Sequence, residues 1–152
     1  MTDIQLVIFD GNGILYNGDG TTAKLNRDVA SMAVAVRDQG VPVAILSSDK
    51  IPPHLQEVLR PIFGNNIAEE INKYSINPED WTMLAKAFSQ NAEIKPDECV
   101  MVDDNADVLE RIESTLNWHT IDGSFVGAIY HKLKGMGIDA HPRRATNRDI
   151  AD

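Results

Sequence analysis

Residues 8–20 read IFDGNGILYNGDG, and this stretch decides the fold. It begins at the end of an apolar run, residues 4–9 (IQLVIF), and the run ends at the carboxylate of Asp10. A continuous apolar run of this length is typical of a strand that is buried on both faces of a parallel sheet. Two positions after the acid, Asn12 provides an amide where a second carboxylate would make chemical sense.

Outward from this strand, short apolar runs alternate with longer amphipathic segments, which predicts parallel strands joined by crossover helices. The predicted strands are residues 4–9, 42–46, 99–102 and 118–121, and the predicted helices are 24–39, 53–60, 78–90, 105–116 and 124–133. The segment ILYNGDGTTA reads as a β-hairpin flap with its turn at residues 17–20. We therefore expect an α/β fold, a Rossmann-like three-layer sandwich with a central parallel sheet.

The length and charge of the chain bound its organisation and its partners. A chain of 152 residues with 43% apolar content is enough for a single domain, expected over residues 1–138 and followed by a polar tail over 139–152. The net charge of −9 argues against nucleic acid as a partner. Because no apolar run approaches the ~20 residues that span a bilayer, we expect no membrane partner and a cytoplasmic location, which the single cysteine also fits.

Acidic residues follow two of the predicted strands: Asp10 follows the first, and Asp103 and Asp104 follow the strand at 99–102. Ligands of open parallel sheets bind beyond the carboxyl ends of the strands, so these acids converge if the strands are neighbours. Carboxylates gathered in a crevice repel one another, and a hard divalent cation with substrate phosphate oxygens neutralises them. The pattern therefore predicts a metal-assisted phosphoryl site.

Three segments in order resemble motifs of the haloacid dehalogenase (HAD) superfamily. LVIFDGNGIL resembles its nucleophile motif, VAILSSDK the strand that ends in a phosphate-binding Ser or Thr, and CVMVDDNAD the strand that ends in paired acids. The resemblance covers residues 4 to about 138. It implies a HAD-like fold and, for most members, hydrolysis of phosphate esters through an aspartyl-phosphate.

The resemblance also implies roles for individual residues. Asp10 would be the nucleophile, and Mg²⁺ would be held by Asp10, the backbone carbonyl of Asn12 and either Asp103 or Asp104, with Asp104 as the first choice. The phosphoryl oxygens would be bound by Ser47 and nearby backbone N–H groups, and Ser48 would be a further substrate-binding residue. The lysine that the family uses to neutralise the phosphate is assigned to Lys73, with Lys50 and Lys86 as alternatives.

Asn12 is the main departure from the family pattern, since in its phosphatases an acid at this position protonates the leaving group and then activates water. An amide does neither, and the loss of general acid–base catalysis costs roughly 10²- to 10⁴-fold in rate. The predicted function is therefore a HAD-like phosphatase with reduced or altered activity. The alternative is a non-catalytic module that binds a phosphorylated partner or assembles with another protein.

The family's dehalogenases also lack the second acid, but they enclose their substrate under a helical cap. Only about 14 residues separate Asp10 from the first predicted helix, and the interval between Ser47 and Lys73 is also short, so no cap domain is expected. A capless site is open. It accepts a large phosphorylated substrate, such as a macromolecule, or takes its cover from a second subunit, and the sequence leaves substrate and homo-oligomeric state open.

Overall fold

A five-stranded parallel sheet forms the middle layer of the computed structural model, which describes residues 2–141. The strand order is β5-β4-β1-β6-β7. The strands are β1 (Leu6–Asp10), β4 (Val43–Leu46), β5 (Ile67–Ala68), β6 (Cys99–Asp103) and β7 (His119–Asp122). Every residue of β1, β4 and β6 is buried, because these central strands are covered on both faces.

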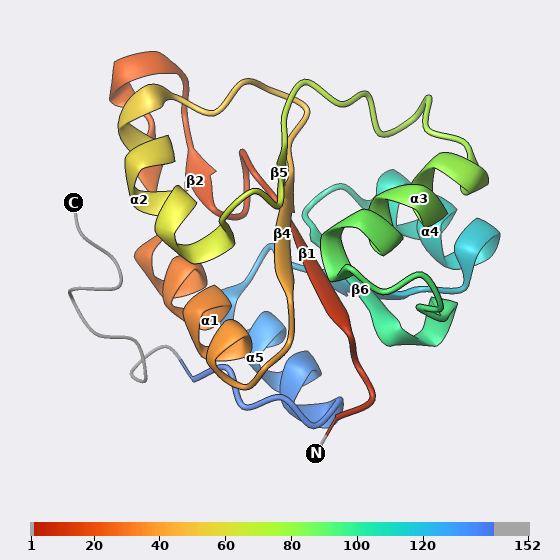
Figure 1. Cartoon of the computed structure of the whole chain (residues 1–152). Coiled ribbons are helices and arrows are strands. Elements are labelled where there is room, and N and C mark those ends of the chain that lie inside the picture. Colours follow the sequence, from red (N-terminus) through yellow and green to blue (C-terminus); the bar gives the residue numbers. More distant parts are fainter. Residues whose placement is uncertain (1, 142–152) are drawn as a thin grey trace.

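Helices cover the two faces of the sheet (Figure 1). On one face lie α1 (Arg27–Asp38), α2 (Pro53–Phe63) and α5 (Val126–Gly135), and on the other lie α3 (Pro78–Ser89) and α4 (Ala106–Leu116). Two short 3₁₀ helices, η1 (Gly20–Thr22) and η2 (Pro96–Glu98), lie in connections between these elements. The hydrophobic core is accordingly divided into two clusters, one on each face, and side chains of β1 enter both. This arrangement is the predicted three-layer sandwich.

The flap is an antiparallel pair of two-residue strands, β2 (Tyr16–Asn17) and β3 (Lys24–Leu25). The predicted hairpin is therefore present, but η1 lies inside its connection, which makes the connection longer than the predicted turn. The helix predicted from residue 24 begins at Arg27, because Lys24 and Leu25 pair with β2. Asn26 caps this helix, and its side chain accepts a hydrogen bond from the amide of Val29 at 3.4 Å.

The largest remaining differences from the sequence-based expectation concern α2, β5 and α5. α2 continues past residue 60, through Pro61, because its last turn buries Ile62 and Phe63. The edge strand β5 was not predicted, since it is two residues long and follows two polar asparagines. α5 begins two residues later than expected, because the Ser124 amide and hydroxyl donate to the Asp122 carboxylate in a turn before the helix.

Packing extends to the end of the described chain. Ala140 is fully buried, and the side chain of Gln39 bonds both the amide and the carbonyl of Asp139. The remainder of the predicted polar tail lies outside the described residues. Among residues 2–141, no helix combines the length and the apolar character that crossing a bilayer requires.

Candidate active site

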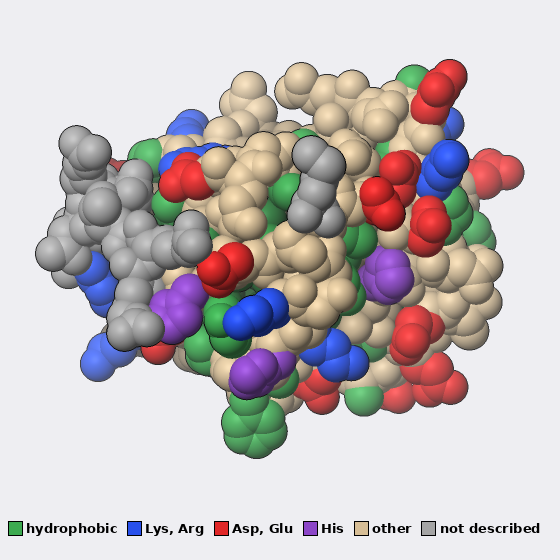
Figure 2. Space-filling view, turned by 90° about the horizontal axis from the view of Figure 1, so that it is seen from below, with side chains coloured by type: hydrophobic (Ala, Val, Ile, Leu, Met, Phe, Trp, Pro, Cys, Tyr) green, Lys and Arg blue, Asp and Glu red, His purple; other side chains and the backbone are tan. Residues whose placement is uncertain are grey.

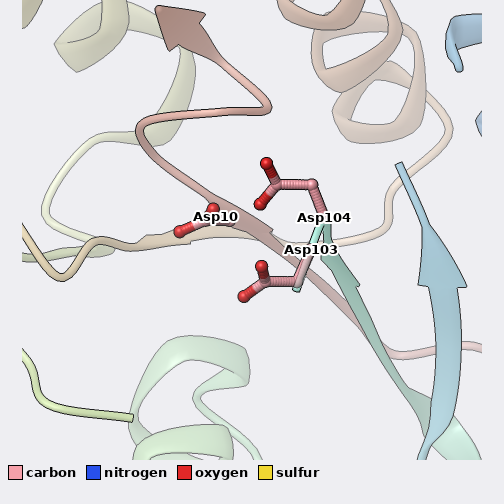
Figure 3. Close-up of side chains that lie close together, drawn as sticks. All are labelled: Asp10, Asp103 and Asp104. Carbon is pink, nitrogen blue, oxygen red and sulfur yellow. The ribbon is translucent and has the colours of Figure 1, made fainter. Parts of the chain in front are cut away.

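Carboxylates gather at the carboxyl edge of the sheet, where β1 and β6 run side by side (Figure 3). Asp10 is the last residue of β1, Asp103 is the last residue of β6, and Asp104 follows it directly. One carboxylate oxygen of each lies within 4.8 Å of the others. Asp10 and Asp103 are buried, whereas Asp104 is exposed. The parallel pairing of the two strands thus brings together the acids that the sequence placed at separate strand ends.

A buried lysine faces two of these acids. Lys73 lies in the segment between β5 and α3, is 6% exposed, and forms ion pairs with Asp10 and with Asp103, the latter at 2.8 Å. The two alternative lysines, Lys50 and Lys86, are both exposed, and Lys86 lies on α3. Of the three candidates, Lys73 is therefore the one that the fold brings to the acids.

Arg111 of α4 holds the segment that carries this lysine. Its guanidinium donates to the carbonyl of Lys73 at 2.5 Å and to the carbonyl of Ile76. Charge-assisted hydrogen bonds of this kind are the strong ones in proteins. Sequence reasoning missed Arg111, because the bonds go to backbone carbonyls that no side-chain pattern reveals.

The cluster carries more negative charge than its lysine balances. Burial raises the pKa of Asp10 to about 7, and the neighbouring Asp103 adds to the rise while Lys73 opposes it. Burial and Asp103 also raise the pKa of Asp104. Burial acts to lower the pKa of Lys73, but its pairing with Asp10 and Asp103 prevails, so that pKa is raised and the lysine stays charged. Three carboxylates against one ammonium leave a site that a cation would stabilise.

The residues of the phosphate-binding prediction lie on the neighbouring strand end. Ser47, fully buried, follows β4, and its hydroxyl lies 3.5 Å from the hydroxyl of Tyr16 in the flap. A Cβ atom added to Gly11 would lie 2.6 Å from the Ser47 Oγ atom, so only glycine permits this close approach of the loop after β1. Ser48 is exposed and lines the same pocket as the acids.

That pocket has a volume of about 220 Å³ and is lined by Asp10, Asn12, Ser48, Lys73, Asp103 and Asp104, together with neighbouring residues of the loops. Three of those neighbours, Asn72, Tyr74 and Asn105, were missed by the sequence analysis. The side-chain amide of Asn105 donates to the Tyr74 hydroxyl at 2.6 Å. This bond holds the exposed tyrosine ring at the rim of the pocket. The predicted substrate and metal side chains thus converge on one cavity, apart from Ser47, which lies buried beside it.

The amide of Asn12 does not bond the acids of the cluster in this structure. Its Nδ2 atom donates to the carbonyl of Gly18 at 3.2 Å and to the carboxylate of Asp49 at 3.4 Å, and its Oδ1 atom accepts from the amide of Gly18 at 3.3 Å. The next residue, Gly13, has φ of +104°, and a Cβ atom there would lie 2.5 Å from Asp104. The loop backbone therefore packs directly against the acid cluster.

The donor set fits a hard divalent cation. Mg²⁺ takes oxygen ligands and is held in proteins through one or two carboxylates plus water and phosphate oxygens. Both carboxylate oxygens of Asp103 already accept hydrogen bonds, one from the Lys73 ammonium and one from the backbone amide of Asn105. Asp104 belongs to the same cluster and is exposed, whereas Asp103 is buried.

Solved structures with the same fold are HAD-superfamily phosphatases and related proteins. The cobalt-bound deoxy-D-mannose-octulosonate 8-phosphate phosphatase of Haemophilus influenzae matches with a TM-score of 0.61 and 13% identity over 90% of this chain and 88% of that one. An uncharacterized protein of Corynebacterium glutamicum matches with a TM-score of 0.63 and 19% identity, over 89% and 96% of the two chains.

The 3-deoxy-D-manno-octulosonate 8-phosphate phosphatase of Moraxella catarrhalis, solved with magnesium, phosphate and its KDO molecule, matches with a TM-score of 0.54 and 17% identity over 75% of this chain. The chain spans 65% of the length of that phosphatase. No protein-family model matches the sequence, and neither does any curated protein. These structural neighbours confirm the predicted HAD-like fold. Within residues 2–141, no additional domain is inserted after β1 or after β4.

Proposed function

We propose that this protein is a Mg²⁺-dependent phosphatase that hydrolyses a small phosphate monoester through an aspartyl-phosphate on Asp10. The observation that carries the proposal is the buried Asp10 at a strand end, with Lys73 on one side and the acid pair of β6 on the other. The phosphatases that share the fold, one of them solved with magnesium and phosphate, support the same reaction class.

The residues of the cluster divide into positions that hold a cation and positions that contact the phosphate. Asp10, the backbone carbonyl of Asn12 and Asp104 would hold Mg²⁺, which when bound neutralises charge on the transferred phosphoryl group. Asp103 then serves mainly to orient Lys73, since its oxygens are engaged by that lysine and by a backbone amide. The hydroxyls of Ser47 and Ser48 would bind phosphoryl oxygens.

In the reaction, a carboxylate oxygen of Asp10 attacks phosphorus, and the bond from phosphorus to the leaving-group oxygen breaks. Water then attacks the aspartyl-phosphate, which releases inorganic phosphate and regenerates Asp10. Lys73 lies where it can shift from the Asp10 carboxylate to the incoming phosphoryl oxygens, and such electrostatic stabilisation dominates phosphoryl transfer. Because Asn12 carries no transferable proton, substrates whose leaving group needs none, such as aryl phosphates and acyl phosphates, would react fastest.

The size and charge of the pocket favour a small substrate. A volume of about 220 Å³ accommodates a phosphoryl group with a compact leaving group. The net charge of −9 disfavours a polyanion as the partner. The face away from the pocket, shown in Figure 2, likewise has Lys and Arg side chains dispersed among acidic ones. We therefore propose a phosphorylated metabolite rather than a nucleic acid or another polyanion.

The experiment is hydrolysis of an aryl phosphate with and without Mg²⁺, comparing the chain with Asp10→Asn. Asp38→Asn, which removes an exposed acid at the end of α1, is the matched control. Magnesium-dependent turnover that persists in the control and disappears in Asp10→Asn is the expected result. Absence of turnover in all three proteins would contradict the proposal.

The second candidate is a non-catalytic module that binds a phosphorylated partner, and one observation favours it: the Asn12 amide bonds the flap and not the acids. Calorimetric titration with inorganic phosphate in the presence of Mg²⁺ distinguishes the two. Tight phosphate binding without turnover of any aryl phosphate would establish the binding module.

A further inference from the structure

The carboxamide of Asn12 connects three parts of the chain. It bonds both the amide and the carbonyl of Gly18, which belongs to the connection between β2 and β3, and its nitrogen also bonds the carboxylate of Asp49 in the loop after β4. The base of the flap is anchored separately, because Ile14, Leu15 and Tyr16 are buried in the core. The tip of the flap, residues 17–24, consists of exposed residues except for Ala23.

We propose that Asn12 is a positioning residue: its amide fastens the flap tip to the loop after β4, and it keeps the pair formed by residues 12 and 49 at a single negative charge beside the phosphate site. The fastening follows from the contacts alone, and the effect on substrate binding rests on the proposed phosphatase function. The inference explains why this position holds an amide.

An aspartate at position 12 cannot make the same bonds. Of the three hydrogen bonds, a carboxylate retains only the one it accepts from the amide of Gly18, because it has no proton to donate to the Gly18 carbonyl or to Asp49. Its charge would also lie about 3.4 Å from the Asp49 carboxylate. Like charges at that separation repel even at an exposed contact such as this one.

The pair lies next to the residue assigned to phosphate binding. The amide of Asp49 donates to the Ser47 hydroxyl at 3.3 Å, and the Tyr16 hydroxyl lies 3.5 Å from the same oxygen. Asn12 itself lines the pocket. A second negative charge on the pair would therefore face the incoming phosphate and displace the loop that carries Ser47.

The chain offers a charge-swapped test. Asn12→Asp leaves the pair with two negative charges, whereas Asn12→Asp combined with Asp49→Asn returns it to one. In the double variant the new amide at position 49 can donate to the new carboxylate at position 12, so two of the three original bonds are possible. Asn17→Asp is the matched control, since it makes the same chemical change at an exposed position of the flap.

The first measurement is hydrogen exchange of the backbone amides of the flap tip. This measurement needs no turnover, so its result does not depend on the proposed function. We expect exchange to be about tenfold faster in Asn12→Asp, a factor corresponding to loss of one to two hydrogen bonds. The double variant should recover most of the protection, and Asn17→Asp should match the parent chain. Equal exchange in all four proteins would overturn the fastening role.

The second measurement is KM and kcat for an aryl phosphate. Asn12→Asp should raise KM by about tenfold or more through charge repulsion, and the double variant should restore it. A KM in Asn12→Asp equal to that of the parent, or one that the double variant fails to restore, would overturn the charge role. If the parent chain shows no turnover, the proposed function fails, and the proposed effect of Asn12 on substrate binding fails with it. The exchange measurement still decides whether Asn12 fastens the flap tip.

Discussion

Replacing Lys73 by methionine should destabilise the metal-free protein far more than an ordinary surface change. The lysine is 6% exposed and is paired with Asp10 and Asp103, so the variant leaves buried carboxylates without a counter-charge. Removing one partner of a buried ion pair costs about 3–5 kcal/mol in the free energy of unfolding. For a chain of this size, each kcal/mol lowers the melting temperature by roughly 2–4 °C, so we expect a fall of roughly 10 °C at pH 8.

Magnesium should reverse part of this loss, because a divalent cation between the same carboxylates replaces the missing charge. The assay is thermal unfolding followed by circular dichroism, with EDTA and with Mg²⁺, and Lys86→Met is the control because it removes an exposed lysine from α3. Equal melting temperatures for the two variants in EDTA would show that the buried ammonium does not balance the charge of the acids.

The remaining predictions concern protonation and positioning within the same site. Because the pKa of Asp10 is raised to about 7 in the fold, the folded state holds this proton more tightly than the unfolded chain does. Its contribution to the free energy of unfolding is therefore complete below pH ~4 and is lost as pH rises through ~7. Urea unfolding of the metal-free protein at several pH values should show this decline in the free energy of unfolding, and Asp10→Asn should remove it. Arg111→Met should lower kcat by about tenfold or more, since the carbonyl of Lys73 loses its charged donor and the ammonium loses its position; an unchanged kcat would refute this role. Gly13→Ala should weaken Mg²⁺ binding in calorimetry, because the added Cβ atom lies 2.5 Å from Asp104 and the φ of +104° disfavours alanine; unaltered affinity would argue against Asp104 as a ligand.

The core of the fold could be predicted from the sequence because its signals are local. Continuous apolar runs identified the central strands, and the acids at the ends of two of them were enough to predict a shared site once the strands were neighbours.

What the sequence did not reveal depends on contacts between distant segments. The strand β5 is too short to carry a periodic pattern, and it is defined by its pairing with β4. Arg111 donates hydrogen bonds to backbone carbonyls of a loop. Asp49 is linked to the site only by its contact with the side chain of Asn12, which is distant in the sequence. Tyr74 lines the pocket and directly follows Lys73 in the sequence, but its residue type alone does not indicate a role in the site.

The measurement that tests the central claim most directly is mass spectrometry of the protein quenched in acid shortly after mixing with an aryl phosphate and Mg²⁺. We expect one added phosphoryl group on the peptide that contains Asp10, absent without Mg²⁺ and absent in Asp10→Asn. A phosphoryl group on another residue, or turnover of the substrate that persists in Asp10→Asn, would contradict it.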